Sequence, residues 1–503
     1  MIHTFEPFGY EGCVTNVEVG LRSGIPSVDV VGISDASVSD FRETLRAVFK
    51  NQNIPFPSER VLISISPADI RKDGYRHVFG AALATIIEKD KLTKAWEKSV
   101  MVVGELELSG KVRAPMNATY AALASAQAQG ICYAIAPVGT VCPKGMKMFT
   151  VDSLAEAYEV LKILNKEETK QVEDNKEEIT FTVPEGESTL DEIKDTPELN
   201  AMKFAMTVAA AGRHNILAIG NPGCGKSMLL TRLPELTPDL LENERNSVTR
   251  IHSIAGLLKG SDGMMTKRPF RMPHQTASVE GMCGGGVNCR PGEVSLAHKG
   301  TIFLDEAAEF RSSVLQMLRV PIENGTITLS RAGRATTFPA DFQLAMATNP
   351  CPCGNYGSHD RICLCSAKSI ELYWRKFSAP LLDRIDIRFN FSKAVGDAAH
   401  YTLSELQNMV KTAWEAQLRR QGKLNRDLTG DELIKYAPLD DECQNLLDSE
   451  IVKHGYSARA IKSIRRVART IADMYGVSDI NRRYLQTAID LRNAGMDEYI
   501  LNS

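Results

Sequence analysis

The sequence has no run approaching the roughly 20 uninterrupted apolar residues of a membrane span, so we expect no membrane partner. Aromatic residues make up only 7 % of the chain and no segment is of low complexity. Apolar residues nevertheless reach 43 %, an ordinary globular content that excludes a fibrous or wholly disordered protein. Neither sign of charge dominates, because 59 Lys and Arg stand against 62 Asp and Glu. Any nucleic-acid site must therefore be local.

The first residues, MIHTFEPFGY, contain neither a basic segment nor an apolar run, so we expect no secretory signal and a cytoplasmic location. The eleven cysteines are odd in number, and four of them are crowded between Cys351 and Cys365. In a large chain without an export signal, this pattern favours free thiols or a metal site over disulfides.

Composition divides the 503 residues into four parts. Residues 1–165 alternate short apolar runs with helix-forming stretches, which predicts an α/β domain. Residues 166–198 carry twelve acidic residues against four basic ones, which predicts a linker that lets the first domain move. Residues 199–390 predict a second α/β domain, and residues 391–503 are mostly helical in pattern.

Short apolar runs and helix-forming stretches locate the main elements of both domains. In the first domain the predicted strands are 102–108 and 131–137, and the predicted helices are 79–88 and 118–128. In the second domain the predicted strands are 215–219, 301–304 and 342–347.

Residues Gly220–Ser227 read GNPGCGKS and satisfy the P-loop pattern G-x-x-x-x-G-K-[ST]. The segment follows a predicted strand and precedes a helical run, so its backbone N–H groups can turn toward a phosphate. Lys226 can reach the terminal phosphates of ATP, and Ser227 can hold Mg²⁺. Cys224 fills a variable position and is expected only to pack. The predicted nucleotide-binding residues are Gly220, Asn221, Pro222, Gly223, Cys224, Gly225, Lys226 and Ser227.

Two further strands end in polar side chains that suit ATP hydrolysis. The run TIFLDEAAEF places Asp305 where it can join the magnesium shell and Glu306 where it can polarise the attacking water. The run FQLAMATNP ends in Asn349, which can orient that water, although an Asn before Pro350 also suits a simple turn. Ligands at the ends of parallel strands are what an open α/β sheet provides, so the second domain is predicted to be an ATPase.

The magnesium-chelatase-like AAA+ ATPases of the ComM/YifB family have segments that resemble GNPGCGKS, FLDEAAEF, ATNPCPCG, APLLDRIDI and SARAIKSIRRVARTIAD. The segments RPFRMPHQTAS and RPGEVSLAHKG are also similar to that family. The resemblance implies ATP and Mg²⁺ as cofactors, an AAA+ core with a helical lid, and a homo-hexameric ring. It also implies that Arg384 is an arginine finger completing a neighbour's site, and that Arg459 is a lid arginine contacting the phosphates. Structural ion pairs are the alternative for both arginines.

The first domain resembles the proteolytic domain of Lon-type enzymes in the stretches ISPADIRKDGYRHVFGAALA and VVGELELSGKVRAPMNATYAAL. That resemblance places Arg76 at the position of the catalytic serine and Thr119 at the position of the catalytic lysine. Neither residue supplies the hydroxyl nucleophile or the amine base that the positions require, so we expect no peptidase activity.

Two loops are candidates for contacting DNA. The segments 326–329 and 335–338 predict β arms around a turn at 330–334, which would present Arg331 and Arg334 to phosphates. An ordinary solvated hairpin is the alternative. The glycines 284–286 form a second candidate pore loop or a flexible connector.

Cys351, Cys353, Cys363 and Cys365 form a C-x-C-x9-C-x-C pattern, which predicts a structural Zn²⁺ site or else reduced or redox-active thiols. The histidines at 252, 274 and 298 have no ligand spacing, so we expect structural roles for them. A predicted helix over 459–471 has apolar residues on one face and, on the other, basic residues that suit a solvated surface. These basic residues are Arg459, Lys462, Arg466 and Arg469, and the interpretation as a solvated surface applies to all of them except Arg459.

Taken with the resemblance, these motifs predict a ring motor that couples ATP hydrolysis to remodelling of single-stranded or branched DNA. By resemblance it is a branch-migration helicase acting in recombination and natural transformation. Two alternatives stay open: a magnesium-chelatase-type motor that drives metal insertion into a porphyrin, and a non-catalytic adaptor that assembles with ATP.

Overall fold

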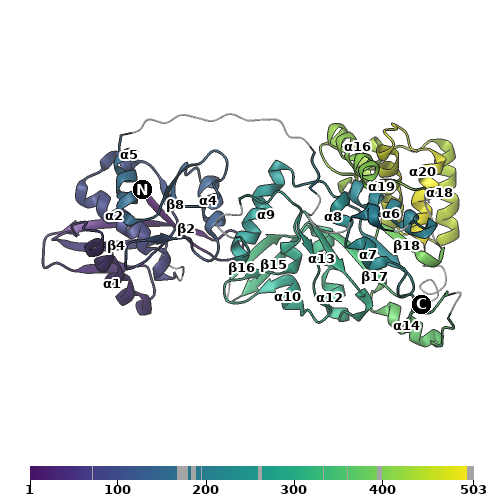
Figure 1. Ribbon diagram of the computed structural model, residues 1–503, viewed down its shortest axis with the longest axis horizontal. Coiled ribbons are helices and arrows are strands. Elements are labelled where there is room, and N and C mark those ends of the chain that lie inside the picture. Colours follow the sequence, from purple (N-terminus) through teal and green to yellow (C-terminus); the bar gives the residue numbers. More distant parts are fainter. Residues whose placement is uncertain are drawn as a thin grey trace.

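The protein is elongated, with an N-terminal domain at one end, a central ATPase core and a helical region packed on the core (Figure 1). The structure is a computed structural model. It describes residues 1–68, 70, 72–166, 179–182, 189–193, 195–258, 263–331, 334–358, 361–393 and 399–494. No helix within these ranges is both long and apolar enough to cross a membrane.

The N-terminal domain is built on a mixed seven-stranded sheet of order β3-β4-β2-β1-β5-β8-β9. Its strands are β1 (Ile2–Glu6), β2 (Cys13–Arg22), β3 (Val28–Val31), β4 (Arg60–Ser66), β5 (Val100–Val102), β6 (Glu105–Leu106), β7 (Val112–Arg113), β8 (Tyr133–Pro137) and β9 (Lys147–Val151). Its helices are α1 (Asp35–Asn51), α2 (Val78–Asp90), α3 (Thr93–Glu97), α4 (Thr119–Ala128) and α5 (Leu154–Leu164).

The core contains a five-stranded sheet of order β11-β14-β17-β10-β18, in which every neighbouring pair is parallel. The strands of the core are β10 (Ile216–Ile219), β11 (Phe270–Arg271), β12 (Gly284–Gly285), β13 (Arg290–Pro291), β14 (Thr301–Leu304), β15 (Thr326–Arg331), β16 (Arg334–Pro339), β17 (Gln343–Thr348) and β18 (Ile387–Asn390). Its helices are α6 (Pro197–Gly212), α7 (Lys226–Leu230), α8 (Leu233–Leu236), α9 (Glu242–Ala255), α10 (Val279–Cys283), α11 (Glu293–Leu296), α12 (Ser312–Met317), α13 (Arg319–Asn324), α14 (Ala367–Arg375) and α15 (Ala379–Leu382).

Both faces of the core sheet are covered, which is why its strands are uniformly apolar. Along β10, Ile216 and Ala218 pack with α6 and the C-terminal helices, whereas Leu217 and Ile219 pack on the opposite face. The register aligns Ile219 of β10 with Thr348 of β17, so the carboxyl ends of these strands meet at one edge.

The C-terminal region is helical and packs on α6. Its helices are α16 (Leu403–Gln421), α17 (Gly430–Tyr436), α18 (Asp441–His454), α19 (Ala458–Met474) and α20 (Arg482–Asn493). On α19 the apolar face is buried as predicted, but the basic face is not simply solvated, because the side chain of Arg469 is 1 % exposed. Arg469 donates to Asp473 and to the carbonyls of Val477 and Ser478, so the loop that leads to α20 covers it.

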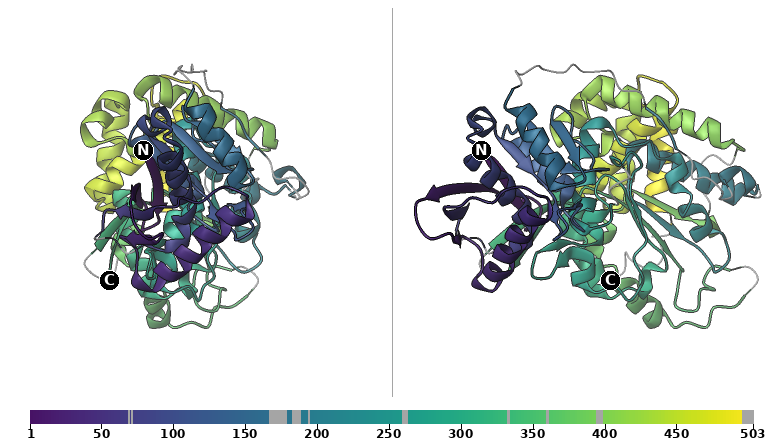
Figure 2. Two further views of the ribbon diagram at one scale, coloured as in Figure 1. Left: turned by 90° about the vertical axis from the view of Figure 1, so that its left-hand side faces the viewer. Right: turned by 60° about the vertical axis from the view of Figure 1, so that its left-hand side comes forward.

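The N-terminal domain is docked on the core (Figures 1 and 2). One apolar cluster runs from Phe5 and Met101 of the first domain to Leu217 and Phe338 of the core. Arg250 of α9 donates to the backbone carbonyls of residues 10 and 11. The two domains therefore share a buried interface in addition to the covalent connection.

The predicted fold class is confirmed: two α/β parts, a parallel-sheet core and a helical C-terminal region. The prediction of one strand over 102–108 is wrong, because Val103 and Gly104 separate β5 from β6. Gly104 has φ +155°, and a Cβ there would lie 2.7 Å from the Val112 side chain. The chain turns at this glycine instead of continuing the strand.

Candidate nucleotide-hydrolysis site

The P-loop connects the buried strand β10 to α7, as the sequence predicts. Gly223 and Gly225 have φ values of +83° and +98°, which let the loop curl back over the strand end. The Lys226 ammonium lies within this curl and donates to the carbonyls of Gly220 at 2.7 Å and Asn221 at 2.9 Å. Lys226 is only 8 % exposed, and this burial lowers the pKa of its ammonium group. A phosphate would replace these carbonyls as the partner of the ammonium.

The acidic residues lie beside the P-loop at the end of β14. The Ser227 hydroxyl donates to Asp305 Oδ1 at 2.7 Å, which brings together the two predicted Mg²⁺ ligands. Glu306 is exposed and adopts φ +48°, a left-handed conformation that is strained for a side chain with a Cβ. A hydroxyl and a carboxylate are hard oxygen ligands, so this pair suits Mg²⁺.

Asn349 follows β17 and joins the same site. Its Oδ1 accepts a hydrogen bond from Lys226 Nζ at 3.2 Å, so the amide lies beside the lysine of the P-loop. The turn alternative for this residue does not account for that contact. The structure thus brings Lys226, Ser227, Asp305 and Asn349 together through direct hydrogen bonds.

Sequence reasoning missed Gln275. Its Nε2 donates to Glu306 Oε2 at 2.6 Å and fixes one oxygen of the proposed water-activating carboxylate. Gln275 lies in the segment RPFRMPHQTAS, which carries the family resemblance, but no local pattern points to Glu306 from 31 residues away.

Arg384 and Arg459 lie together at the opposite edge of the sheet. Both guanidinium groups pair with Glu323, which stands at the end of α13. Asn215, at the amino end of β10, donates to the carbonyl of Arg384 at 3.0 Å, whereas the P-loop follows the carboxyl end of this strand. A four-residue strand spans about 13 Å. Neither arginine therefore contacts the P-loop of its own chain.

A cavity of about 750 Å³ adjoins these two arginines. Among the described residues, its lining includes Glu323, Arg384, Arg426 and Arg459, and none of the P-loop residues. Five carboxylates also line this cavity, so its guanidinium groups have acidic partners within the chain: Glu323, Asp341, Asp383, Asp386 and Asp427.

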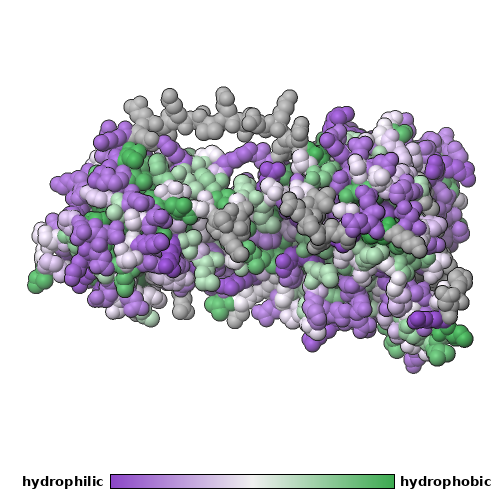
Figure 3. All heavy atoms as spheres, viewed as in Figure 1, coloured by the Kyte–Doolittle hydropathy of each residue, from purple (hydrophilic) through white to green (hydrophobic). Residues whose placement is uncertain are grey.

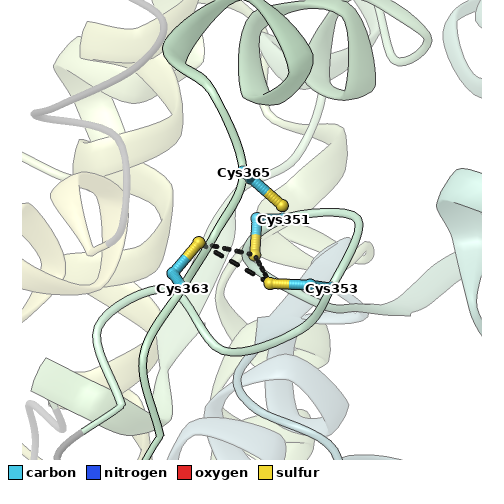
Figure 4. A group of neighbouring side chains, drawn as sticks. All are labelled: Cys351, Cys353, Cys363 and Cys365. Carbon is cyan, nitrogen blue, oxygen red and sulfur yellow. Dashed lines mark hydrogen bonds between the residues drawn. The ribbon is translucent and has the colours of Figure 1, made fainter.

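The four clustered cysteines converge in one loop (Figure 4). Their sulfur atoms all lie within 4.8 Å of one another, and three of the distances are 3.4, 3.6 and 3.7 Å. A disulfide has an S–S length of about 2.05 Å. A tetrahedral Zn²⁺ with Zn–S bonds of about 2.3 Å has S···S edges of about 3.8 Å, which these distances match closely.

Apolar side chains gather near α14 on the surface of the cysteine loop (Figure 3). Ile362 is 83 % exposed and Leu364 is 89 % exposed. Cys363, which lies between them in the sequence, and Cys365, which follows them, point toward the other cysteines (Figure 4). This alternation shows that the loop directs its thiols toward one point instead of burying its apolar residues.

The described residues of both candidate DNA loops contact the N-terminal domain. Strands β15 and β16 pair as an antiparallel hairpin in which Arg331 is opposite Arg334, while residues 332 and 333 lie outside the described part of the chain. Tyr10 N donates to Thr336 Oγ1 at 3.0 Å. In the second candidate loop, β12 pairs with β13, and the carbonyl of Asn288 accepts a hydrogen bond from Gly9 N. A flexible connector at residues 284–286 would not account for these contacts.

Arg76 and Thr119 line one cavity of about 20 Å³ in the N-terminal domain. This volume holds about one water molecule and no peptide. Arg76 donates to Asn117 Oδ1 at 2.7 Å, so its guanidinium has a partner within the N-terminal domain.

Two of the three histidine candidates are packed in the interior and Cys224 is half-buried, whereas His274 lies on the surface. His252 and His298 are buried and hydrogen-bonded, and burial lowers the pKa of His298 to about 3. His274 is exposed and contacts Thr276. Cys224 packs against the core cluster, as expected.

The core carries a P-loop, and an acidic pair and a polar side chain follow two neighbouring parallel strands beside it. Helices of the C-terminal region pack on this core. Together these features define a P-loop ATPase of the AAA+ class. Protein-family models for "Magnesium chelatase, subunit ChlI" match residues 191–398, and those for its C-terminal region match 402–492. A further model, "Subunit ChlI of Mg-chelatase", matches residues 17–139.

Curated relatives align over almost the whole chain. The YifB protein of Salmonella typhimurium is 34 % identical over 98 % of this chain and 96 % of its own length. Competence protein ComM of Haemophilus influenzae is 32 % identical over 98 % of this chain and 97 % of its own length. The chain belongs to the YifB/ComM family of magnesium-chelatase-like AAA+ ATPases, a membership that implies ATP and Mg²⁺ as its cofactors.

Proposed function

We propose that this ATPase is a ring-forming motor that remodels single-stranded or branched DNA, acting as a branch-migration helicase in recombination. The observation that carries the proposal is the separation of the P-loop from Arg384 and Arg459 on opposite edges of one sheet. A motor with this arrangement completes its site only when subunits stand side by side. The name "competence protein" of the H. influenzae relative supports a role with incoming DNA in natural transformation.

Within one subunit, Lys226 and the P-loop amides bind the phosphates, and Ser227 and Asp305 hold the metal. Mg²⁺, when bound, neutralises charge on the β- and γ-phosphates. Glu306 polarises the attacking water, Gln275 positions the Glu306 carboxylate, and Asn349 orients the water or the γ-phosphate.

Across the subunit interface, Arg384 and Arg459 contact the phosphates bound by the neighbouring chain. The side chains of Glu323 and Arg459 are 45 % and 39 % exposed, whereas that of Arg384 is 12 % exposed. Arg384 therefore has to leave its pairing with Glu323 before it reaches a phosphate. Repeating such a head-to-tail contact closes a ring, which we propose to be a homo-hexamer.

The β15–β16 hairpin is proposed to hold the DNA backbone through Arg331 and Arg334. Replacing both with Ala should weaken DNA binding at every sequence, because phosphate contacts carry no sequence information. Removing one phosphate contact to a single strand lowers the slope of log affinity against log salt by about 0.7, so the slope should fall by roughly 1–2. A salt titration measures it. Basal ATPase should persist, and an unchanged slope with normal branch migration would contradict the assignment.

The ATPase rate with and without DNA tests the proposed function as a whole. We expect single-stranded or branched DNA to stimulate hydrolysis, because a motor couples turnover to movement of its substrate. The matches to magnesium-chelatase models favour one other candidate, a motor that drives metal insertion into a porphyrin. It requires stimulation by a porphyrin-binding partner and none by DNA. Turnover indifferent to both would favour an adaptor that uses ATP to assemble.

A structural Zn²⁺ bound by Cys351, Cys353, Cys363 and Cys365 is the remaining cofactor that we propose. The support is that the three S···S distances among Cys351, Cys353 and Cys363 match the edges of a zinc–thiolate tetrahedron, and that Cys365 Sγ lies within 4.8 Å of all three.

A further inference from the structure

The cysteine knuckle, comprising the described residues of 351–365, is attached at both ends to the nucleotide site. Its first ligand pair begins two residues after Asn349, and Cys351 is fully buried. Its second pair leads directly into α14, whose N-terminal cap is Ser366. The two pairs are nine residues apart, so an ion between them would close a loop that joins the end of β17 to the start of α14.

Helix α14 returns to the segment that carries Asn349. The Tyr373 and Thr348 hydroxyls are hydrogen-bonded at 2.9 Å, and Trp374 Nε1 donates to the carbonyl of Pro350 at 3.1 Å. The residues immediately before and after Asn349 are thus held by a helix whose first turn follows the second ligand pair.

The knuckle also contacts the P-loop directly. Gly354 has φ +77°, and a Cβ at this position would lie 2.7 Å from the ring carbons of Pro222 and 3.8 Å from Cγ of Asn349. This close approach requires glycine, and it places the backbone of the knuckle against the phosphate-binding loop.

We propose that the four-thiolate site positions Asn349 against the P-loop for ATP hydrolysis, so that turnover depends on the metal while nucleotide binding does not. This inference rests on the Zn²⁺ site and the ATPase activity proposed above. The ion fixes the knuckle, the knuckle fixes Gly354 against Pro222, and α14 fixes the residues on both sides of Asn349. The phosphate-binding amides lie in the loop between β10 and α7, and β10 is paired with a strand on each side in the sheet. Misplacement of a reacting group by about 1 Å costs on the order of 10²-fold in rate.

Cys363→Ser removes one ligand and is compared with Cys132→Ser, which alters an exposed thiol in the N-terminal domain. Elemental analysis should find about one Zn²⁺ per chain in the wild type and the control, and far less in Cys363→Ser. The kcat for ATP should fall about tenfold or more in Cys363→Ser. The dissociation constant for ADP should change less than about threefold, because the P-loop amides remain in place. Reversible chelation of the wild-type protein, followed by Zn²⁺, should remove and restore turnover if the variant does not fold.

Gly354→Ala tests the contact between the knuckle and Pro222 separately from metal binding. It keeps all four thiols, so zinc content should be unchanged, and visible bands of tetrahedral thiolate coordination should persist after Co²⁺ substitution. Its kcat should nevertheless fall, because the new methyl group pushes the knuckle away from Pro222. Gly357→Ala is the matched control: it also has positive φ, at +71°, but its Cβ would meet Ser392 Oγ at 3.7 Å instead of the P-loop.

The outcomes distinguish the separate claims. Full kcat in zinc-free protein, or in Gly354→Ala, overturns the positioning role and leaves the Zn²⁺ site standing. Wild-type protein with four titratable thiols and no zinc overturns the metal site and this inference together. Wild-type protein with zinc but without ATP hydrolysis contradicts the proposed function itself.

Discussion

Lys226→Ala should abolish nucleotide binding, whereas Glu306→Gln should bind nucleotide normally and fail to hydrolyse it. The Lys226 ammonium is held by two loop carbonyls and by Asn349, at the place where the terminal phosphates must lie. Its removal leaves no cation in the described P-loop to balance their charge. Glu306 is hydrogen-bonded to Gln275, which lies outside the P-loop, so its replacement spares binding.

The expected loss for Glu306→Gln is about 10²–10³-fold in kcat, the usual effect of removing one group that acts on the transition state. Calorimetric titration with ADP and steady-state ATPase measurements separate the two variants. Glu309→Gln is the matched control, because Glu309 is an exposed carboxylate three residues further along the same turn. Turnover by Glu306→Gln at the wild-type rate would show that another group activates the water.

Local sequence patterns predict the nucleotide site because its parts lie where strands end. The residues of the P-loop are consecutive, and Asp305 and Asn349 each follow an apolar run, so parallel strands bring all three to one edge. Gln275 and Glu323 escaped notice because their roles depend on partners distant in sequence. Gln275 contacts a carboxylate 31 residues away, and Glu323 joins Arg384 to Arg459 across separate elements.

Amphipathic periodicity shows which residues of a helix are charged, but it does not show what covers them. The pattern predicts a solvated face for Arg469, yet the loop after α19 supplies carbonyls for its guanidinium. The contact between the N-terminal domain and the core could not be predicted either. The acidic composition of the linker says nothing about the apolar interface that the two domains share. Gly9 marks that interface: it has φ +57°, and a Cβ there would lie 2.2 Å from Thr336 Oγ1.

Arg384→Ala should lower kcat by about 10³-fold while leaving nucleotide binding intact, as loss of an arginine finger does in other nucleotide hydrolases. The guanidinium lies at the amino end of the sheet with Glu323, and the P-loop of the same chain lies at the carboxyl end. We therefore expect Arg384 to contribute to a neighbouring subunit, and we expect mixing of chains to repair the defect.

Rings assembled from equal amounts of Arg384→Ala and Lys226→Ala chains provide the decisive measurement. Each Arg384→Ala chain offers an intact P-loop, and each Lys226→Ala chain offers an intact Arg384. With random assembly, about a quarter of the interfaces join these two and are complete, because every contact in a ring is head-to-tail. ATPase activity should therefore rise well above that of either variant alone. The control mixes Lys226→Ala chains with Lys226→Ala/Arg384→Ala chains, which can form no complete interface. Co-assembled rings that show no recovery would mean that Arg384 acts within its own chain, and that the sheet edge bearing Arg384, Arg459 and Glu323 has to rearrange to reach the P-loop.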